Sequence, residues 1–255
     1  MAQRTRYTPG SFCWVGLAAS DRADAAAFYT RLFGWQADEL AADQAGMYSL
    51  FRRGGDDVAI AYRQTAEARA ARARPHWTSY ISVEDADATA ARARELGGAA
   101  VFRKAFDADD AGRVAAIRDP TGAIVSLWQP RSRIGATLVN DPGAWCWNEL
   151  ATTDVERAKS FFAELLGWEY GTDDSGQVWI RNDGRLNGSI RKTRATPPQW
   201  LPHFAVADVE EAARRAEQLG ARRLGPAERT RRGRSLMLAD PQAAMFAIFE
   251  GETDP

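Results

Sequence analysis

The chain has 255 residues, of which 45% are hydrophobic and 26% charged, so it is long enough for one large globular domain or two of about 125 residues. Its 33 basic and 34 acidic residues leave a formal charge of −1, which gives no attraction to nucleic acid or to an anionic membrane. No segment approaches the roughly 18 apolar residues of a membrane span, and the amino terminus lacks the apolar core of a signal peptide. We therefore expect a cytoplasmic protein that binds neither nucleic acid nor membrane.

An internal repeat is the strongest feature of the sequence. Residues 9–21 recur as 142–154, 133 positions later, residues 75–97 recur as 198–220, 123 positions later, and residues 113–129 recur as 234–250, 121 positions later. The decreasing offset indicates shorter loops in the second copy. The repeat predicts two tandem domains, 9–130 and 142–251, joined by a linker at 131–141.

The two cysteines, Cys13 and Cys146, occupy the same place in the two copies. A cysteine that recurs with the repeat has the same structural position in each copy. We therefore expect two strand residues facing the core, and no disulfide in a reducing compartment.

In the first copy, strands and helices follow one another in a regular order. Residues 12–18 form an apolar run typical of a strand, and apolar residues at helical spacing follow it. This helix stops at Gly34, because glycine favours the left-handed conformation that ends helices. Asp85 opens a second, alanine-rich helix that ends at Gly97. We expect short strands after the helices at 46–52, 58–63, 114–118 and 123–129.

The second copy repeats this order with its own helix signals. Thr153 to Glu156 fits a capping box before the helix that matches the first one, and Asp208 with Glu211 fits the same pattern before the later helix. Together the two copies give four βαβββ units, which predicts an α+β fold.

These patterns resemble the vicinal-oxygen-chelate superfamily, and more closely the tandem-domain glyoxalase/bleomycin-resistance-like proteins of actinobacterial type. The resemblance rests on the strand, Asp, helix and Leu-Phe-Gly-Trp or Leu-Leu-Gly-Trp pattern of residues 21–35 and 154–168, and on the Asp-Pro-Thr-Gly of 119–122. It covers nearly the whole chain. It implies two domains, each a pair of βαβββ modules that form a curved sheet around a cup.

Metal-dependent members of this superfamily hold a divalent cation with His, Gln and Glu side chains inside the cup. In this sequence the residues at the three implied ligand positions are mostly unable to bind a metal. They are Trp14, Thr78 and Ser126 in the first copy, and Trp147, Leu201 and Ala247 in the second. We expect no metal and no other cofactor.

Residues that could carry chemistry instead lie in the second copy. Side chains alternate across a strand, so Trp147, Glu149, His203 and Phe249 should face the second cup. A carboxylate facing an imidazole in an apolar pocket could act as a general acid/base pair, which makes Glu149 and His203 the candidate catalytic residues. The structural alternative is that Glu149 pairs with an arginine such as Arg181 and that His203 is a satisfied core histidine.

Aromatic residues form the second candidate set. They could stack on a flat or cationic ligand, although such residues more often fill a core. The set comprises Trp14, Tyr80 and Trp128 in the first copy, and Trp147, Trp179, Trp200 and Phe249 in the second. The arginine-rich stretch 229–234 either clamps an anionic group or is a solvated loop. The Asp-Pro pairs at 119–120 and 240–241 indicate turns.

Three functions remain open on the sequence. The first is metal-independent binding of a small organic metabolite, of the resistance or secondary-metabolism kind. The second is a cofactor-free lyase, isomerase or cyclase that uses Glu149 and His203 for acid/base chemistry. The third is a metal-dependent glyoxalase, similar to lactoylglutathione lyase, or a dioxygenase. The partner is in each case a small molecule. Fusion of the copies could supply an internal pseudo-dimer, so we expect either a monomer or a homodimer.

Overall fold

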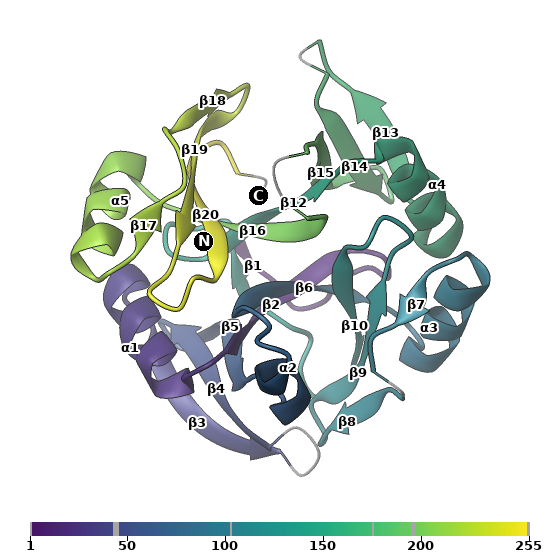
Figure 1. Cartoon of the computed structure of the whole chain (residues 1–255), viewed down its shortest axis with the longest axis horizontal. Coiled ribbons are helices and arrows are strands. Elements are labelled where there is room, and N and C mark those ends of the chain that lie inside the picture. Colours follow the sequence, from purple (N-terminus) through teal and green to yellow (C-terminus); the bar gives the residue numbers. More distant parts are fainter. Residues whose placement is uncertain (1, 43–45, 103, 175, 195–196, 254–255) are drawn as a thin grey trace.

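The computed structural model describes residues 2–42, 46–102, 104–174, 176–194 and 197–253. Two nine-stranded mixed sheets dominate it, one from each copy, and a two-stranded sheet joins β1 to β11. The sheet orders correspond strand for strand: β3-β4-β5-β2-β6-β10-β9-β7 in the first half, with β8 beside β9, and β13-β14-β15-β12-β16-β20-β19-β17 in the second, with β18 beside β19. The predicted α+β architecture of two curved sheets is confirmed (Figure 1).

The first half contains two βαβββ modules joined by antiparallel pairing of β2 with β6. Its elements, with the short β1 that precedes them, are β1 (Ala2–Gln3), β2 (Phe12–Ala19), α1 (Arg22–Phe33), β3 (Gln36–Ala42), β4 (Gly46–Arg53), β5 (Asp56–Arg63), α2 (Ala66–Ala70), β6 (His76–Ser82), α3 (Ala86–Glu95), β7 (Ala99–Ala100), β8 (Phe106–Ala108), β9 (Gly112–Arg118) and β10 (Ile124–Pro130).

The second half has the same order, with β12 paired antiparallel to β16. Its elements, preceded by β11 (Leu138–Val139), are β12 (Trp145–Thr152), α4 (Val155–Leu166), β13 (Glu169–Thr172), β14 (Val178–Asn182), β15 (Arg185–Lys192), β16 (Gln199–Ala205), α5 (Val209–Gln218), β17 (Arg222–Arg223), β18 (Glu228–Thr230), β19 (Gly233–Ala239) and β20 (Met245–Gly251). No helix in the described part of the chain is long and apolar enough to cross a membrane.

Helix boundaries follow the local sequence signals, with one correction. The side chain of Asp85 accepts a hydrogen bond from the backbone N–H of Ala88, and Gly34 closes α1 at φ 73° in the left-handed region. The predicted capping box at Thr153 to Glu156 is wrong by one residue. Asp154 is the N-cap of α4, because its carboxylate accepts from the N–H of Arg157. The first helix of each half is therefore capped by the repeated aspartate.

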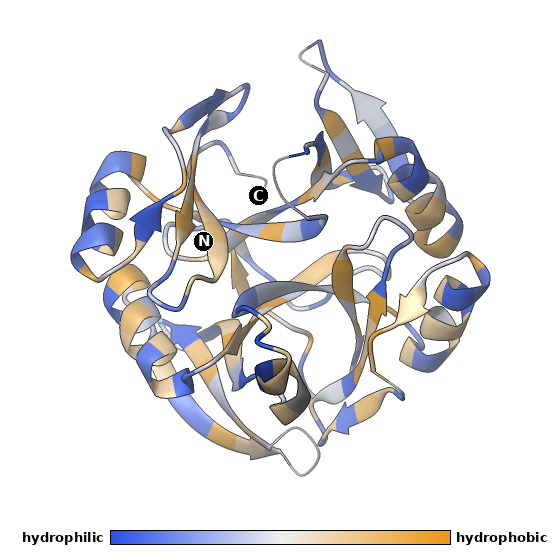
Figure 2. Cartoon of the chain, viewed as in Figure 1, coloured by the Kyte–Doolittle hydropathy of each residue, from blue (hydrophilic) through white to orange (hydrophobic). Residues whose placement is uncertain are grey.

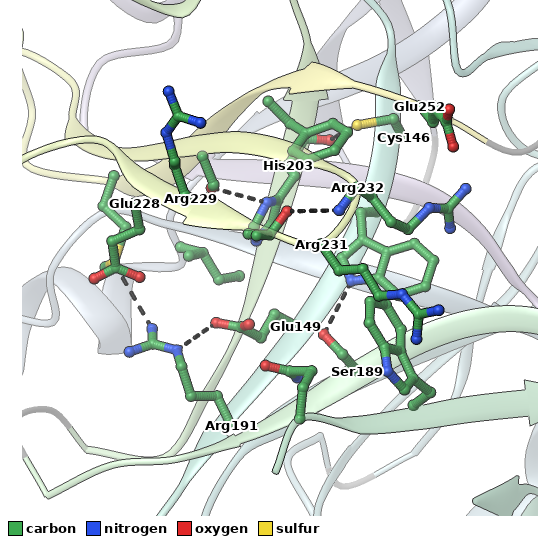
Figure 3. Close-up of a pocket in the computed structure, with 18 of the residues that line it drawn as sticks. Cys146, Glu149, Ser189, Arg191, His203, Glu228, Arg229, Arg231, Arg232 and Glu252 are labelled. Atoms are coloured by element: carbon green, nitrogen blue, oxygen red, sulfur yellow. Dashed lines mark hydrogen bonds and ion pairs between the residues drawn. The ribbon is translucent and has the colours of Figure 1, made fainter. Parts of the chain in front are cut away.

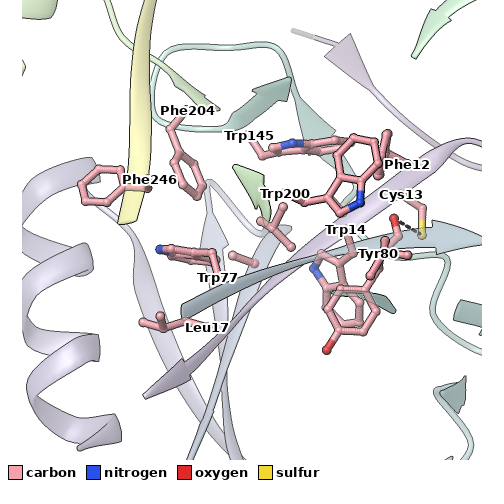
Figure 4. Packing of buried hydrophobic residues seen from close by; sticks show 14 of the residues in the cluster. Phe12, Cys13, Trp14, Leu17, Trp77, Tyr80, Trp145, Trp200, Phe204 and Phe246 are labelled. Atoms are coloured by element: carbon pink, nitrogen blue, oxygen red, sulfur yellow. Dashed lines mark hydrogen bonds between the residues drawn. The ribbon is translucent and has the colours of Figure 1, made fainter. Parts of the chain in front are cut away.

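The two halves pack through their central strands, β6 against β16, and through helix pairs at either side, α1 beside α5 and α3 beside α4 (Figure 1). Figure 2 shows apolar residues along the strands between the halves and hydrophilic residues on the outer faces of the helices. Aromatic rings from both halves fill this interface (Figure 4). The interface is a hydrophobic core of the molecule, which removes apolar area of both sheets from water.

Two tryptophans each donate a hydrogen bond to a glycine that precedes the first long strand of the opposite half. The indole N–H of Trp35 donates to the carbonyl of Gly143 at 2.6 Å, and that of Trp168 donates to the carbonyl of Gly10 at 2.7 Å. Both glycines adopt positive φ values, 86° at Gly10 and 85° at Gly143, which explains the repeated Pro-Gly pair. Each half thus binds the segment that leads into the first long strand of the other half.

A chain of hydrogen-bonded side chains lies inside the interface. The repeat produces a second, equivalent set of positions, but these do not form such a chain. The indole of Trp77 donates to the hydroxyl of Tyr29 at 2.9 Å, and that hydroxyl donates to Asp240 at 2.9 Å. The equivalent of Tyr29 in the second half is Phe162. As a result the indole nitrogen of Trp200 and the Oδ2 atom of Asp119 are buried without a partner in the described structure.

We predict that Phe162→Tyr stabilises the protein by about 1 kcal/mol, because the new hydroxyl would bridge two buried polar atoms that now lack partners. Urea denaturation measures the free energy of unfolding. The matched variant Tyr29→Phe should lower it by about 1–3 kcal/mol, since it leaves the other indole and carboxylate unpaired. A loss of stability in Phe162→Tyr comparable to that in Tyr29→Phe would contradict the bridging argument.

Candidate functional site

A cavity of about 310 Å³ lies in the concave face of the second sheet. Strands β12, β14, β15, β16, β19 and β20 supply its walls and floor, and the turn between β18 and β19 supplies part of its mouth (Figure 3). This volume is at the lower end of the range for small-molecule sites. Of the predicted residues, it brings together Glu149, His203, Trp147, Trp179 and Phe249.

Trp147 and Trp179 form the aromatic wall. Their ring centroids are 5.6 Å apart with an interplanar angle of 67°, an edge-to-face contact. The indole of Trp147 donates to Ser189 Oγ at 3.0 Å, and that of Trp179 donates to Asp173 Oδ2 at 3.0 Å. Both tryptophans are only partly buried, so parts of their rings remain accessible from the cavity.

An ion pair lies on the polar part of the floor. Arg191 Nε donates to Glu149 Oε1 at 2.6 Å, and the Glu149 side chain is only 14% exposed. The structural alternative for Glu149, pairing with an arginine such as Arg181, is met by a different arginine, because Arg181 donates to the carbonyl of Gly184. The pairing is with Arg191 because β15 lies beside β12 in parallel register, with Glu149 opposite Ser189.

His203 lies two residues along β16 from the position opposite Glu149 and is 7% exposed. Its Nδ1 atom is 3.4 Å from Ser235 Oγ, and its Nε2 atom has no hydrogen-bond partner in the described part of the chain. Burial, followed by the positive charge of Arg191, lowers the pKa of His203 to about 3. The ring is therefore neutral at physiological pH, and Glu149 bonds to Arg191 rather than to the imidazole.

The arginines of the stretch 229–234 lie in two different environments, the mouth of the cavity and the opposite side of the sheet. Arg229, Arg231 and Arg232 border the mouth of the cavity, and the guanidinium of Arg232 lies 5.8 Å from the centre of the Trp147 ring. Arg234 points to the other side of the sheet and pairs with Glu210 at 3.0 Å. Only the first part of the stretch belongs to the site.

The first cup has the same fold but its aromatic residues fill it. Trp14, Tyr80 and Trp128 are 2–4% exposed and contact one another, with Trp14 and Trp128 centroids 5.4 Å apart. A Cβ atom at Gly16 would lie 3.0 Å from the Tyr80 ring, and one at Gly112 would lie 2.5 Å from the Trp128 ring. These glycines make room for the large side chains, so the predicted aromatic residues of the first cup present almost no free face.

Tertiary structure adds site residues that the sequence did not indicate, and it relocates one. Ser189, Arg191, Ser235 and Met237 line the second cavity. Arg191 corresponds to Tyr62 of the first half. The repeat could have indicated this position, but only once the strand registers are known. Trp200 lies in the interface between the halves, against Phe12 and Phe162, and not in the cup.

The residues at the implied metal-ligand positions do not fit a divalent cation. Trp147, Leu201 and Ala247 stand there in the second cup, and none has a donor atom suitable for a metal. Among the described residues, no group of three or more His, Cys, Asp or Glu side chains could hold a metal ion. We therefore assign no step to a metal.

The fold and the cup define a class of protein, and family comparison agrees with it. Residues 11–127 match the family described as the glyoxalase/bleomycin resistance protein/dioxygenase superfamily, and residues 146–249 match a glyoxalase-like domain. The chain belongs to this superfamily, which is the vicinal-oxygen-chelate superfamily, as two tandem copies.

Two curated relatives span almost the full length of the chain. The "Putative glyoxylase CFP32" of Mycobacterium tuberculosis is 35% identical over an alignment of 258 positions that covers 98% of this chain and 98% of that one. The "Anthracycline biosynthesis protein DnrV" of Streptomyces peucetius is 33% identical over an alignment of 266 positions that covers 96% of this chain and 95% of that one.

Solved structures show the same fold at low identity. A Mn(II)-bound glyoxalase from Novosphingobium aromaticivorans is 15% identical with a TM-score of 0.66, and the match covers 95% of this chain and 82% of that one. The 2,3-dioxygenase LapB from Pseudomonas sp. KL28 is also 15% identical, with a TM-score of 0.64 and coverage of 100% and 95%. At this identity the similarity concerns the fold alone.

We predict that the depressed pKa of His203 makes stability depend on pH. Above the ordinary histidine pKa of about 6.5 neither the folded nor the unfolded state binds the proton, whereas below it only the unfolded state does. Stability is therefore fully present above pH 6.5 and falls as the pH drops towards 3. Between pH 7 and pH 5 this amounts to a loss of about 2 kcal/mol.

The measurement is urea denaturation of the wild type and of His203→Gln at both pH values. The variant should lose less stability by roughly that amount, because glutamine does not titrate. Equal losses in the two proteins would show that His203 accepts a proton in the folded state.

Proposed function

We propose that the second cup binds a small, planar organic molecule without a metal. The observation that carries this proposal is the contrast between the cups: equivalent positions are filled by buried rings in the first half, whereas the second half has a cavity of about 310 Å³. Its wall offers the half-buried rings of Trp147, Trp179 and Phe249. Such rings stack on flat ligands, and a few polar groups on the floor fix their orientation.

The polar groups suit one end of such a ligand. The Glu149–Arg191 ion pair and His203 line the same cavity as the aromatic rings (Figure 3). Because the imidazole is neutral, it offers one donor and one acceptor without the cost of burying a further charge. The names of two relatives are consistent with a ring-containing metabolite, since they refer to anthracycline biosynthesis.

Proton transfer by Glu149 is a second candidate, favoured by a specific observation. Arg191 bonds only one oxygen of this carboxylate, Oε1, in the described structure, and the carboxylate borders the cavity. His203 is a poor general base, because a group with a pKa of about 3 binds protons weakly at neutral pH. Conversion of a bound ligand to a product distinguishes an enzyme from a sequestering protein.

We predict that Trp147→Phe weakens binding of a planar ligand about tenfold, because the smaller ring loses stacking area and its bond to Ser189. A soluble anthraquinone sulfonate serves as the ligand, and quenching of tryptophan fluorescence reports its affinity. Trp14→Phe is the matched control: the same change at the equivalent position of the filled cup should leave the affinity unchanged.

Dialysis of the wild type against EDTA should also leave this affinity unchanged. A decrease that added Mn²⁺ or Zn²⁺ restores would contradict metal-independent binding. Equal effects of Trp147→Phe and Trp14→Phe would contradict the choice of the second cup.

A further inference from the structure

A buried ring nitrogen on the cavity floor lacks a partner. His203 lines the cavity, its Nδ1 atom lies by Ser235, and its Nε2 atom has no hydrogen-bond partner in the part of the chain that the structure describes. Leaving a buried polar atom unpaired costs free energy, about 1–3 kcal/mol. A ligand that pairs with Nε2 recovers this cost, so the site favours a ligand with a polar atom at this point.

The neighbouring hydroxyl decides what Nε2 can do. A neutral imidazole has one nitrogen that donates and one that accepts. When the Ser235 hydroxyl donates to Nδ1, Nε2 carries the proton and becomes a donor. The complementary ligand atom is then an acceptor, and a negatively charged oxygen is the strongest acceptor.

A cation lies on the same floor. Arg191 bonds Glu149 through Nε, its charge also interacts with that of Glu228, and its Nη2 atom is 3.8 Å from Met237 Sδ. Met237 on β19 and His203 on β16 both lie opposite Ala247 on the strand between them. Because the Arg191 guanidinium contacts Met237, it extends to the row of residues across the sheet that includes His203. Arg191 is also a cause of the lowered pKa of His203. The positive field of the arginine therefore acts at the imidazole.

This combination occurs in only one of the two cups. The counterparts of Arg191 and His203 in the first half are Tyr62 and Tyr80, which occupy the equivalent floor positions. Burial raises the pKa of both phenols, so both remain uncharged. At these two positions a donor beside a cation is thus present in the second cup and absent from the first.

We infer that the ligand of the second cup is a planar phenol or enol that binds as its anion, with its oxygen accepting from His203 Nε2 and facing the Arg191 guanidinium. The inference rests on the proposed function, because it names the ligand class of the same cavity. The ligand hydroxyl releases its proton to solvent, and no other bond forms or breaks. Both contacts favour the anion over the neutral form, so binding lowers the pKa of the ligand.

Two dyes of matched shape test this. Alizarin red S is a dihydroxyanthraquinone sulfonate whose anion absorbs at longer wavelength, and anthraquinone-2-sulfonate lacks the hydroxyls. We expect the bound hydroxylated dye to show the anion spectrum at a pH where the free dye is neutral at that hydroxyl, with its apparent pKa lowered by about 1–2 units. The dye without hydroxyls should bind about tenfold more weakly.

Variants assign the effect to the named side chains. Arg191→Met combined with Glu149→Gln removes both charges of this ion pair together, and it should abolish the pKa shift of the dye. His203→Leu should reduce the shift, whereas His203→Gln, which keeps an N–H donor, should retain most of it. Arg222→Met removes an exposed charge of the same half outside the cavity and should change nothing. Circular dichroism establishes that each variant is folded.

The outcomes separate the inference from the proposed function. Binding of neither dye would overturn the proposed function and the inference with it. Equal binding of both dyes without an anion spectrum would overturn the inference alone. An undiminished shift in the folded double variant would overturn the role of Arg191, and an equal loss of the shift in Arg222→Met would show that only general electrostatics is involved.

Discussion

Two indole hydrogen bonds exchanged between the halves constrain the rest of the structure. Trp35 and Trp168 each follow the first helix of their own half and donate to a glycine carbonyl before the first strand of the other half. Because each bond is buried, breaking it would leave a donor and an acceptor unsatisfied. Together with the aromatic packing of β6 against β16, this exchange joins the two sheets. The concave face of the second sheet is left to line a cavity.

The two cups differ through coupled changes at facing positions. Gly16 leaves space for Tyr80, since a Cβ at residue 16 would already lie 3.0 Å from that ring. In the second half Glu149 replaces the glycine, so a tyrosine at position 203 would clash, and the smaller histidine stands there. Close packing allows few such combinations. One cup is therefore a solid part of the core, whereas the other has polar groups around an open volume.

The charged groups on the floor of the second cup are the side chains of Glu149 and Arg191. The fold is shared with a Mn(II)-bound glyoxalase, but the implied ligand positions in the second cup carry Trp147, Leu201 and Ala247, which do not bind metals. A partly buried ion pair is costly to desolvate and contributes little net stability. This pair lies on the floor beside a histidine with an unpaired nitrogen, which is the arrangement that the proposed ligand binding uses.

The sequence by itself determined the duplication, the order of strands and helices and the superfamily, because apolar periodicity, capping residues and turn glycines act locally and recur in both copies. It also indicated that Glu149, His203, Trp147 and Phe249 share one face, because side chains alternate along a strand. Tertiary structure decided the partner of Glu149 and the neutral state of His203, since both depend on strand register and burial. It also decided that Trp200 lies between the halves while Trp179 lies at the cavity, because residues of one type are distinguished only by what packs against them.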